Sequence, residues 1–308
     1  MTVLVVGSFT MDYTVETPRF PKTGETVLGK DYKTSLGGKG ANQGMAARML
    51  GSEVTMVGMV GRDAHGDTII ESFEKAGVDM THVRRCETKS GLASIMIDPE
   101  GENRIVMVPG ANYAYPPEAL HGLRSAIGSA DVVMAQLEMP IKVVETLGEI
   151  CEALGKTFIV NPAPMHPLSN ELLGRISILT PNETELASLV DRASLTTMDA
   201  VSEAAHTLLD KGVDHVVVTL GKKGALLVDA SGTHHLQGYE VKAVDTVAAG
   251  DAFNGALAHS LARGDALEEA VRFANAAGAL TVQAYGAINA LPSKHAMDTF
   301  LNADNPKR

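Results

Sequence analysis

Six short apolar runs recur along the chain, and each ends in turn-forming or polar residues. They are TVLVVGS, EVTMVGMVG, ADVVMAQLE, KTFIVNPAP, ISILTPNETE and HVVVTLGKKG. Apolar runs without alternation are typical of strands buried on both faces, as in a parallel sheet. Helical patterns that end at glycine lie among them: GANQGMAARMLG, DTIIESFEKAG, IKVVETLGEICEALG and MDAVSEAAHTLLDKG. This alternation predicts an α/β fold with a mainly parallel central sheet.

Two stretches depart from this alternation and predict a second, smaller β-sheet. Residues 13–36 are strand-like with turn residues and no helical pattern, and residues 91–109 form a hairpin pattern with its turn around Pro99 to Asn103. A layer of this kind often covers a site as a lid. Because no repeat, low-complexity tract or linker interrupts the chain, we expect one domain over 1–308 with this lid attached.

Composition limits the classes of partner. The formal net charge of -11 disfavours a nucleic-acid-binding surface, which would be basic. No run approaches the ~20 apolar residues of a membrane span. The N-terminus lacks the basic segment of a signal peptide, and the two cysteines, Cys86 and Cys151, form neither a metal spacing nor a disulfide framework. We therefore expect a cytoplasmic protein that binds neither nucleic acid nor membrane.

Polar residues follow the predicted strands at one edge of the sheet. They are Asp12, Glu138, Asn161, Asn182, Glu185 and the turn from Gly221 to Gly224. Ligands of open parallel sheets bind at the carboxyl ends of the strands, so this edge is the expected site. For any one of these residues the alternative is a helix cap or a turn. The chain has neither a Walker-type phosphate loop nor a dinucleotide-binding glycine pattern after the first strand.

The stretch VDTVAAGDAFNG predicts an anion site beside a carboxylate. Phe253, Ala256, Leu257 and Leu261 form a helical stripe that closes at Gly264. The residues from Ala248 to Asp251 therefore lie at a helix N-terminus, where free backbone N–H groups attract an anion. Asp251 could simply cap the helix, but a carboxylate beside an anion hole is what phosphoryl transfer to a hydroxyl requires.

A second glycine-rich stretch, LGGKGANQG, precedes another helical pattern. Gly37 and Gly38 allow backbone amides to approach a ligand, and Lys39 and Asn42 offer side-chain donors. Alone, this stretch is also compatible with an ordinary glycine turn before a helix. Together with the carboxylate stretch, it indicates a ligand site.

At these residues the sequence resembles the ribokinase-like (PfkB) carbohydrate kinases, with the ribokinase subgroup as its nearest match. GGKGANQ and DTVAAGDAFNGAL resemble the two family signatures, and KTGETVLG, QLE, NPAP, TPNETE and VTLGKKGA occur in the family order along essentially the whole chain. The resemblance implies a Rossmann-type three-layer sandwich with a β-sheet lid. It also implies an ATP-dependent sugar kinase that phosphorylates the primary hydroxyl, O5, of ribose.

The resemblance also implies individual roles. Asp251 would be the base, and Ala248, Ala249 and Gly250 would form the anion hole. The sugar would be bound by Thr10, Asp12, Gly38, Lys39, Gly40, Asn42, Glu138 and Asp251. ATP would contact Asn182, Thr219, Gly221, Gly224, Gly250 and Asn275. Glu185 would hold Mg²⁺ through water, and Asp245, Val247, Thr281, Ala284 and Gly286 would hold a monovalent cation, K⁺. The lid would form a homodimer interface.

Two positions depart from the family pattern. Thr10 stands where the family has a sugar-contacting asparagine, which opens deoxyribose, another sugar or a nucleoside as the acceptor. Ala290 stands where the family has a serine of the cation loop, so one oxygen ligand would be lost. A non-catalytic sensor on the same fold is the alternative from another class. It is disfavoured because Gly250 and Asp251 are both present.

Overall fold

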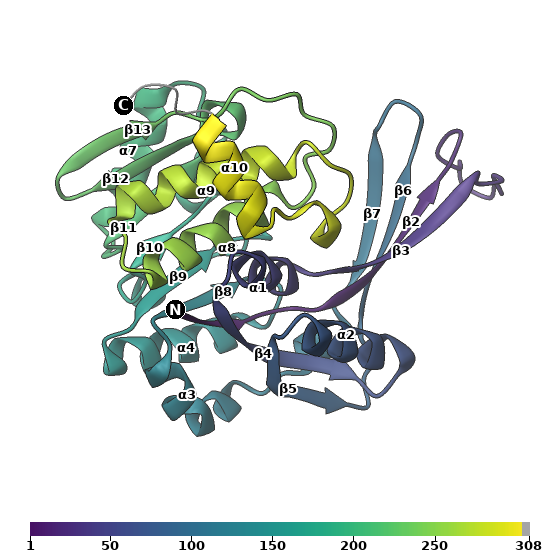
Figure 1. Ribbon diagram of the computed structural model, residues 1–308, viewed down its shortest axis with the longest axis horizontal. Coiled ribbons are helices and arrows are strands. Elements are labelled where there is room, and N and C mark those ends of the chain that lie inside the picture. The colour runs from purple at the N-terminus through teal and green to yellow at the C-terminus, as the bar shows by residue number, and fades with distance from the viewer. Residues whose placement is uncertain (304–308) are drawn as a thin grey trace.

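The computed structural model describes residues 1–303, and its main body is a nine-stranded sheet in the order β13-β12-β11-β10-β9-β8-β1-β4-β5 (Figure 1). The last part of the predicted domain, 304–308, lies outside the described residues. The strands of this sheet are β1 Thr2–Val6, β4 Glu53–Gly61, β5 Asp79–Cys86, β8 Val132–Gln136, β9 Thr157–Asn161, β10 Ile178–Leu179, β11 His215–Thr219, β12 Ala225–Asp229 and β13 Gly232–Leu236.

Neighbouring strands from β5 to β11 run parallel, and β12 and β13 add an antiparallel hairpin at one edge. The predicted α/β fold with a mainly parallel sheet is therefore confirmed. All six apolar runs supply strands of this sheet, β1, β4, β8, β9, β10 and β11. Their carboxyl ends lie at one edge, as parallel pairing requires.

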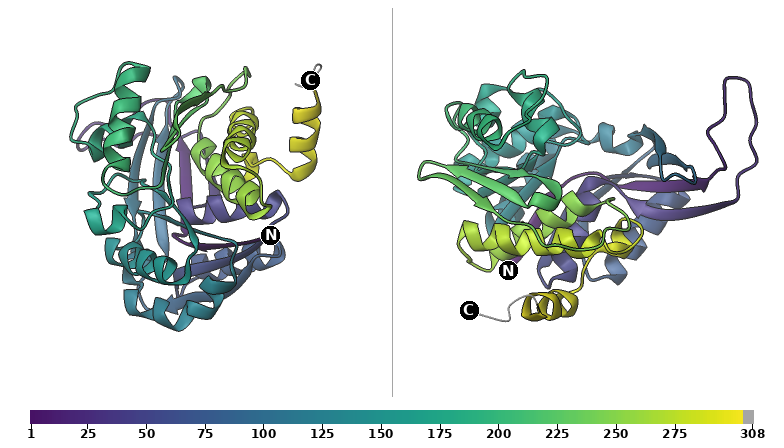
Figure 2. Two further views of the ribbon diagram at one scale, coloured as in Figure 1. Left: turned by 90° about the vertical axis from the view of Figure 1, so that its left-hand side faces the viewer. Right: turned by 90° about the horizontal axis from the view of Figure 1, so that it is seen from above.

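Helices cover both faces of the sheet, so the strands are buried on both sides (Figure 2). One face carries α3 Arg124–Ser129, α4 Ile141–Leu154, α5 Asn170–Leu173, α6 Glu183–Leu189 and α7 Met198–Leu209. The other carries α1 Lys39–Met49, α2 Ala64–Lys75, α8 Ala249–Ala262, α9 Leu267–Thr281 and α10 Lys294–Ala303. Short 3-10 helices occur at η1 Gly110–Ala114, η2 Pro117–Leu123, η3 Gly221–Lys223 and η4 Ile288–Ala290. None of the helices within 1–303 is both long and apolar enough to cross a membrane.

Strand β1 shows why a continuous apolar run is needed in this fold. Leu4 and Val6 contribute to the core on the face of α4, whereas Val3 and Val5 contribute to the core on the face of α1. Each buried side chain of this size stabilises the folded state by about 1.5–3 kcal/mol relative to exposure. A polar residue at any of these positions would lie against one of the two helix layers.

Helix α4 begins and ends where its sequence predicts. Val143, Val144 and Leu147 lie on its buried face at helical spacing. The helix ends at Gly155, whose φ of 61° lies in the left-handed region that glycine adopts without a steric penalty. The amphipathic pattern and the glycine together account for both the burial and the length of this helix.

The small sheet has the order β3-β2-β6-β7 and projects from the body (Figure 1). Its strands are β2 Thr10–Glu16, β3 Asp31–Gly37, β6 Gly91–Ile97 and β7 Asn103–Val108. The β2–β3 and β6–β7 pairs are antiparallel hairpins, and β2 and β6 are parallel. Both predicted stretches supply two strands, although β2 begins three residues earlier than 13.

The root of the small sheet is formed by Phe9, Gly91 and Asn112. The backbone N–H of Phe9 donates to Asn112 Oδ1 over 2.9 Å, and Asn112 Nδ2 donates to the carbonyl of Phe9 over 2.8 Å. A Cβ at Gly91 would lie 2.6 Å from that carbonyl oxygen, so only glycine fits there. The root therefore fixes the start of β2 against the body, immediately before Thr10.

Candidate active site

The candidate active site lies at the carboxyl edge of the large sheet, where the N-termini of α1 and α8 meet. Asp251 is in the first turn of α8 and is 7% exposed. Its Oδ2 accepts a hydrogen bond of 2.8 Å from Asn42 Nδ2, and its Oδ1 accepts one of 3.0 Å from Gln43 Nε2. Burial raises the pKa of Asp251, and the opposing effects of Lys39, Gln43 and Asn42 are smaller. A buried carboxyl with a raised pKa is a stronger proton acceptor than an exposed aspartate.

The backbone before Asp251 has the geometry of an anion site. Ala248 is the N-cap residue of α8 and has a φ of 59°, a conformation that non-glycine residues rarely adopt. The first N–H groups of a helix have no partner within the helix. Ala248, Gly250 and Asp251 line a cavity of about 240 Å³, and a Cβ at Gly250 would meet no atom within 4 Å. These free amides can therefore reach a ligand in that cavity.

A second polar group lies between the N-terminus of α1 and the start of β2. Thr10 Oγ1 donates to Asp12 Oδ1 over 2.7 Å, and the backbone N–H of Lys39 donates to Glu138 Oε2 over 2.8 Å. Burial raises the pKa of Asp12, and the charge of Glu138 raises it further. Asn42 is 7% exposed, and its Oδ1 has no hydrogen-bond partner within 1–303. A buried acceptor without a partner is costly, so a ligand hydroxyl would satisfy it.

Close backbone approaches explain the glycines of the α1 loop. A Cβ at Gly40 would lie 2.5 Å from the backbone nitrogen of Ser8, and a Cβ at Gly38 would lie 2.9 Å from the carbonyl oxygen of Ser8. Gly38 also has a φ of 97°. The loop GGKG therefore lies directly against the turn after β1, which brings Lys39 and Asn42 to the same edge as Glu138.

Lys39 is surrounded by carboxylates. Burial alone would lower its pKa, but Asp251, Glu138 and Glu185 together raise it. The lysine therefore stays charged and partly compensates the negative charge of the buried acids. This single cation lines the 240 Å³ cavity together with Asp251 and Glu185, so a negatively charged group entering the cavity would meet it.

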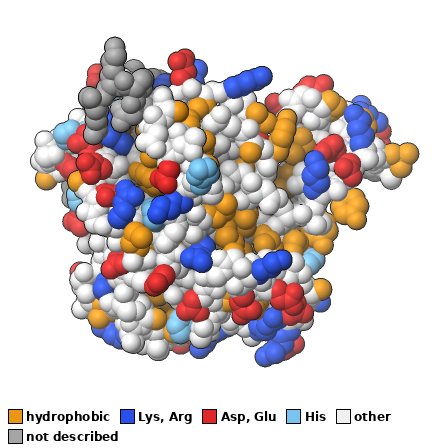
Figure 3. All heavy atoms as spheres, viewed as in Figure 1, with side chains coloured by type: hydrophobic (Ala, Val, Ile, Leu, Met, Phe, Trp, Pro, Cys, Tyr) orange, Lys and Arg blue, Asp and Glu red, His pale blue; other side chains and the backbone are white. Residues whose placement is uncertain are grey.

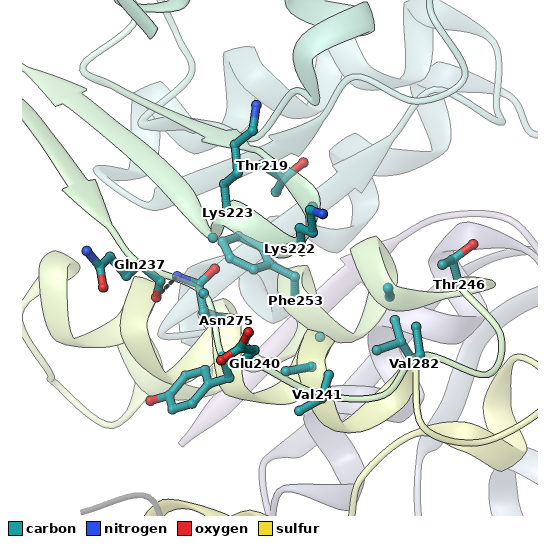
Figure 4. A pocket seen from close by; sticks show the side chains of 18 of the residues that line it. Thr219, Lys222, Lys223, Gln237, Glu240, Val241, Thr246, Phe253, Asn275 and Val282 are labelled. Atoms are coloured by element: carbon teal, nitrogen blue, oxygen red, sulfur yellow. Dashed lines mark hydrogen bonds between the residues drawn. The ribbon is translucent and has the colours of Figure 1, made fainter.

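A larger cavity of about 880 Å³ adjoins the first one (Figure 4). Thr219, Thr246 and Gly250 line both cavities. The larger cavity contains the predicted residues Thr219 and Asn275 and the predicted turn from Gly221 to Gly224, and also residues that the sequence did not single out, including Tyr239 and Glu240. Its size falls within the range of small-molecule pockets.

Two residues shape the wall of this larger cavity. Asn275 Nδ2 donates to the carbonyl of Leu236 over 3.0 Å and to that of Gln237 over 3.4 Å, the bond drawn in Figure 4, which fixes its side chain to the end of β13. Gly224 has a φ of 94°, and a Cβ there would lie 2.1 Å from the carbonyl oxygen of Leu236. The turn after β11 and the end of β13 are therefore in direct backbone contact.

Asn182 and Glu185 form a capping box at the N-terminus of α6. Asn182 Oδ1 accepts from the backbone N–H of Glu185 over 2.8 Å, and Glu185 Oε2 accepts from that of Asn182 over 2.9 Å. Both residues also line the 240 Å³ cavity, and burial raises the pKa of Glu185. These two residues therefore cap the helix and also face the cavity.

Within 1–303, no cluster of three His, Cys, Asp or Glu side chains could hold a metal ion alone, so a divalent ion here needs ligand or water oxygens.

The predicted cation-loop residues come together through Asp245. Its Oδ1 accepts from the backbone N–H of Val247 over 3.0 Å, and its Oδ2 accepts from that of Gly286 over 3.0 Å. The backbone N–H of Ala284 donates to the carbonyl of Thr281 over 3.2 Å, which closes the turn. The neighbouring η4 contains Ala290, which adds no side-chain oxygen. Carbonyl and carboxylate oxygens of this kind suit a hard cation.

The sequence reasoning missed the polar residues beneath Asp251. Gln43, Gln136, Thr180 and Asn254 are all buried, at 0–1% exposure. Gln43 belongs to the motif GGKGANQ, and Asn254 to GDAFNG, so motif membership was the available signal. A helical pattern alone gives no reason to expect a buried glutamine.

The chain is similar to known proteins over most of its length. The family model described as pfkB family carbohydrate kinase matches residues 2–294. The ribokinase of Haemophilus influenzae is 36% identical over 97% of this chain and 98% of its own, and the deoxyribokinase of Salmonella typhi is 34% identical over 98% and 99%. The structure of Arabidopsis thaliana ribokinase complexed with ribose and ATP superposes with a TM-score of 0.90 and 35% identity, covering 97% of this chain and 98% of that one.

Proposed function

Since this chain belongs to the pfkB family of carbohydrate kinases, we propose that it transfers the γ-phosphate of ATP to the primary hydroxyl, O5, of ribose, giving ribose 5-phosphate and ADP. The observation that carries the proposal is the position of Asp251. Its carboxylate lines the small cavity, which meets the larger cavity at Thr219, Thr246 and Gly250, and it accepts a hydrogen bond from Asn42 of the polar group at the start of α1. A base at that junction can reach an acceptor hydroxyl and a donor phosphate at once.

Asp251 acts as the general base. It accepts the proton of the sugar hydroxyl while the bond from the hydroxyl oxygen to the γ-phosphorus forms and the bond to the leaving ADP oxygen breaks. The backbone amides after the N-cap residue Ala248 stabilise the charge on the transferred group. They are the amide of Gly250 and that of Ala249, whose N–H donates to the carbonyl of Thr246 over 3.4 Å before the ligand enters. Because the carboxylate is held from both sides by Asn42 and Gln43, it needs little reorganisation during the step.

The sugar is bound by the polar group at the start of β2 and α1. Asp12 and Glu138 accept hydrogen bonds from sugar hydroxyls, and Lys39 and the backbone of Gly38 and Gly40 complete the pocket. The Oδ1 of Asn42, which has no partner within the described chain, accepts a further hydroxyl. Burial of several carboxylates around one small volume favours a polyhydroxylated ligand, because each hydroxyl can donate to a carboxylate.

ATP occupies the larger cavity. Gly221, Gly224 and Asn275 line the larger cavity alone, whereas Thr219, Asn182 and Gly250 line the small cavity with Asp251 and lie toward the phosphates. Glu185 would hold Mg²⁺ through water, and that ion would supply charge neutralisation for the phosphate oxygens. Asp245 and the backbone of Val247, Thr281, Ala284 and Gly286 would hold K⁺, which would order the loop before α8.

The test of the base is Asp251→Asn in the presence of Mg²⁺ and K⁺. We expect kcat to fall by about 10²–10⁴-fold while ATP binding, measured by calorimetry, persists. Asp229→Asn in the edge hairpin is the matched control and should leave kcat unchanged. ATP consumption is first compared among ribose, deoxyribose, fructose and nucleosides. Turnover with none of them would refute the proposal, and full activity of Asp251→Asn would refute the assignment of the base.

A second acceptor, deoxyribose, is favoured by the geometry at Thr10. Its Oγ1 already donates to Asp12 Oδ1 over 2.7 Å, so the hydroxyl proton is not available to a sugar oxygen. One of the relatives is named deoxyribokinase and is 34% identical. A site with one donor fewer discriminates less against a sugar that lacks a hydroxyl.

The ratio of kcat/KM for ribose to that for deoxyribose separates the two acceptors. A wild-type ratio above one supports ribose, and a ratio below one supports deoxyribose. Thr10→Asn adds an amide donor and should raise the ratio roughly tenfold, the value of one hydrogen bond. Thr34→Asn, on an exposed part of β3, is the control. A ratio that does not respond to Thr10→Asn would remove the geometric support for deoxyribose.

We also propose that the chain is a single kinase unit in which the small sheet is the lid and forms a homodimer interface. Every residue of the edge strand β7 is exposed, including Ile105, Val106, Met107 and Val108, and Figure 3 shows hydrophobic side chains over the small sheet and beside its junction with the body. Exposed apolar patches of this kind mark association surfaces. Light scattering should report a dimer that Val106→Lys dissociates.

The use of ATP supports a cytoplasmic location.

A further inference from the structure

A chain of buried amide side chains lies beneath Asp251 and joins four elements of the body. Gln136 Nε2, at the end of β8, donates to Gln43 Oε1 over 2.7 Å. Gln43 Nε2, in α1, donates to Asp251 Oδ1 over 3.0 Å and to Asn161 Oδ1 over 3.1 Å. Gln43 therefore uses both of its N–H donors and its carbonyl oxygen, and it lies at the branch point of the chain.

The chain returns to α8 by a second route. Asn161 Nδ2 donates to the carbonyl of Thr180 over 3.0 Å, and Thr180 Oγ1 donates to Asn254 Oδ1 over 2.6 Å. Asn254 Nδ2 donates to the carbonyl of Gly250 over 2.8 Å. The first turn of α8 is thus held at two points, at the carboxylate of Asp251 and at the backbone of Gly250.

The direction of each hydrogen bond is determined by chemistry. A carboxylate only accepts, so the side of the Gln43 amide that faces Asp251 must be the nitrogen. Its oxygen then faces Gln136, which must donate. A reversed amide at Gln43 would place its oxygen against the Asp251 carboxylate and would leave the Gln136 donor facing another donor. The donors and acceptors of these amides are therefore mutually compatible. Asp251 is the ionisable residue among the side chains of this chain of hydrogen bonds.

We propose that Gln43 is a positioning residue for Asp251, and that it holds Oδ1 of the base so that Oδ2 remains directed at the acceptor hydroxyl. The proposal rests on the proposed kinase function. It also predicts how Gln43 acts on the chemistry of the base. The hydrogen bond from Gln43 lowers the pKa of Asp251 against the stronger effect of burial. Without that bond the carboxylate would rotate more freely and would protonate at higher pH.

The first experiment compares Gln43→Met with Gln136→Met. Gln43→Met keeps a side chain of similar length without a donor, and we expect kcat to fall about 10–100-fold, in line with the sensitivity of reactions to ~1 Å misplacement. The KM values for sugar and ATP should change less than about threefold, because Gln43 touches neither ligand. Gln136→Met leaves both hydrogen bonds to Asp251 in place and should have a smaller effect.

The pH profile separates positioning from general structural support. The acidic limb of the kcat profile should move to higher pH in Gln43→Met and should stay in place in Gln136→Met. A lower kcat with an unmoved acidic limb, or a wild-type kcat in Gln43→Met, would overturn the proposal. Should Gln43→Met fold poorly, Gln43→Glu replaces it. Gln43→Glu preserves the volume, adds a charge beside Asp251, and should move the acidic limb further in the same direction.

A double-mutant cycle keeps the proposal separable from the kinase assignment. The change in melting temperature caused by Gln43→Met is measured in the wild-type background and in Asp251→Ala, which removes both acceptor oxygens. A different change in the two backgrounds supports the contact that the proposal requires, even if the wild type turns over none of the sugars tested. The same change in both backgrounds would refute the contact, whereas absent turnover alone would refute only the proposed function.

Discussion

Gly255→Ala should separate the base from the residues that hold it. Gly255 lies on α8 one turn after Asp251, where α8 crosses α1. A Cβ at this position would lie 2.5 Å from the Cβ of Ala46 and 2.5 Å from the carbonyl oxygen of Gln43. Non-bonded carbon atoms are stable at about 3.5–4.0 Å, so the helices would have to move apart by about 1 Å.

That displacement acts directly on Asp251. Its two hydrogen bonds reach across to α1 at 2.8 and 3.0 Å, and an added ~1 Å would take both beyond the useful range of a hydrogen bond. We expect kcat to fall about 10²-fold. Overpacking of a core contact destabilises by about 1–3 kcal/mol, which corresponds to a fall in melting temperature of several degrees for a chain of this size.

The assay is steady-state kinetics with calorimetric melting on the same preparations. Gly128→Ala in α3 is the matched control, since a Cβ there would lie 3.8 Å from Leu154 Cδ1, an ordinary contact. This control should retain wild-type kcat and melting temperature. If Gly255→Ala kept both values, the close crossing of α1 and α8 would not constrain the base. If only the melting temperature fell, the coupling of that crossing to Asp251 would be refuted.

Three further predictions concern other sites. Burial raises the pKa of the Cys151 thiol to about 12, so iodoacetamide at pH 8 should label it only after unfolding, as mass spectrometry can check; labelling in the native state would contradict this. Burial lowers the pKa of His259 to about 4, so the unfolded chain binds this proton more readily, and stability should fall as pH drops from 6.5 to about 4. His259→Gln should flatten that fall in melting temperature, and an unchanged slope would disprove the assignment. Gly224→Ala should raise the KM for ATP and leave the KM for sugar unchanged, because its Cβ would clash with the Leu236 carbonyl; equal KM values for wild type and variant would argue against this wall of the cavity.

The large sheet could be predicted because most of its strands are apolar runs that can be recognised in the sequence. The central residues of β1, β8, β9 and β11 are buried on both faces of the sheet, so the sequence is apolar there. β5 could not be predicted because it lies at the sheet edge, where polar residues such as Thr81, Arg84 and Arg85 interrupt its apolar ones. The parallel pairing of β2 with β6 also could not be predicted, since it depends on contacts between residues about 80 positions apart.

Some residues of the site could likewise be predicted from the sequence, and others could not. Asp251, Lys39 and Asn42 stand within short motifs whose composition indicates an anion site, so they could be chosen from the sequence. Gln43 could not be given a role, because its partner Asp251 is 208 residues away. The amphipathic pattern of a helix shows which face is buried, but not which polar atom a buried glutamine will meet. Side-chain networks that cross between elements remain outside the reach of local patterns.

The root of the small sheet acts as a fulcrum close to the reactive groups. Asp12 lies two residues after Thr10, about 7 Å along the strand, whereas Glu16 lies six residues after it, about 20 Å. Asp12 is three residues and Glu16 seven residues from Phe9, so a rotation about Phe9 and Asn112 would move Glu16 a little more than twice as far as Asp12. With the small sheet as the proposed lid, its outer part would sweep widely to admit a sugar while Asp12, nearer the root, would stay close to its contact distance. Access to the pocket and retention of the sugar would then depend on different lengths of the same strand.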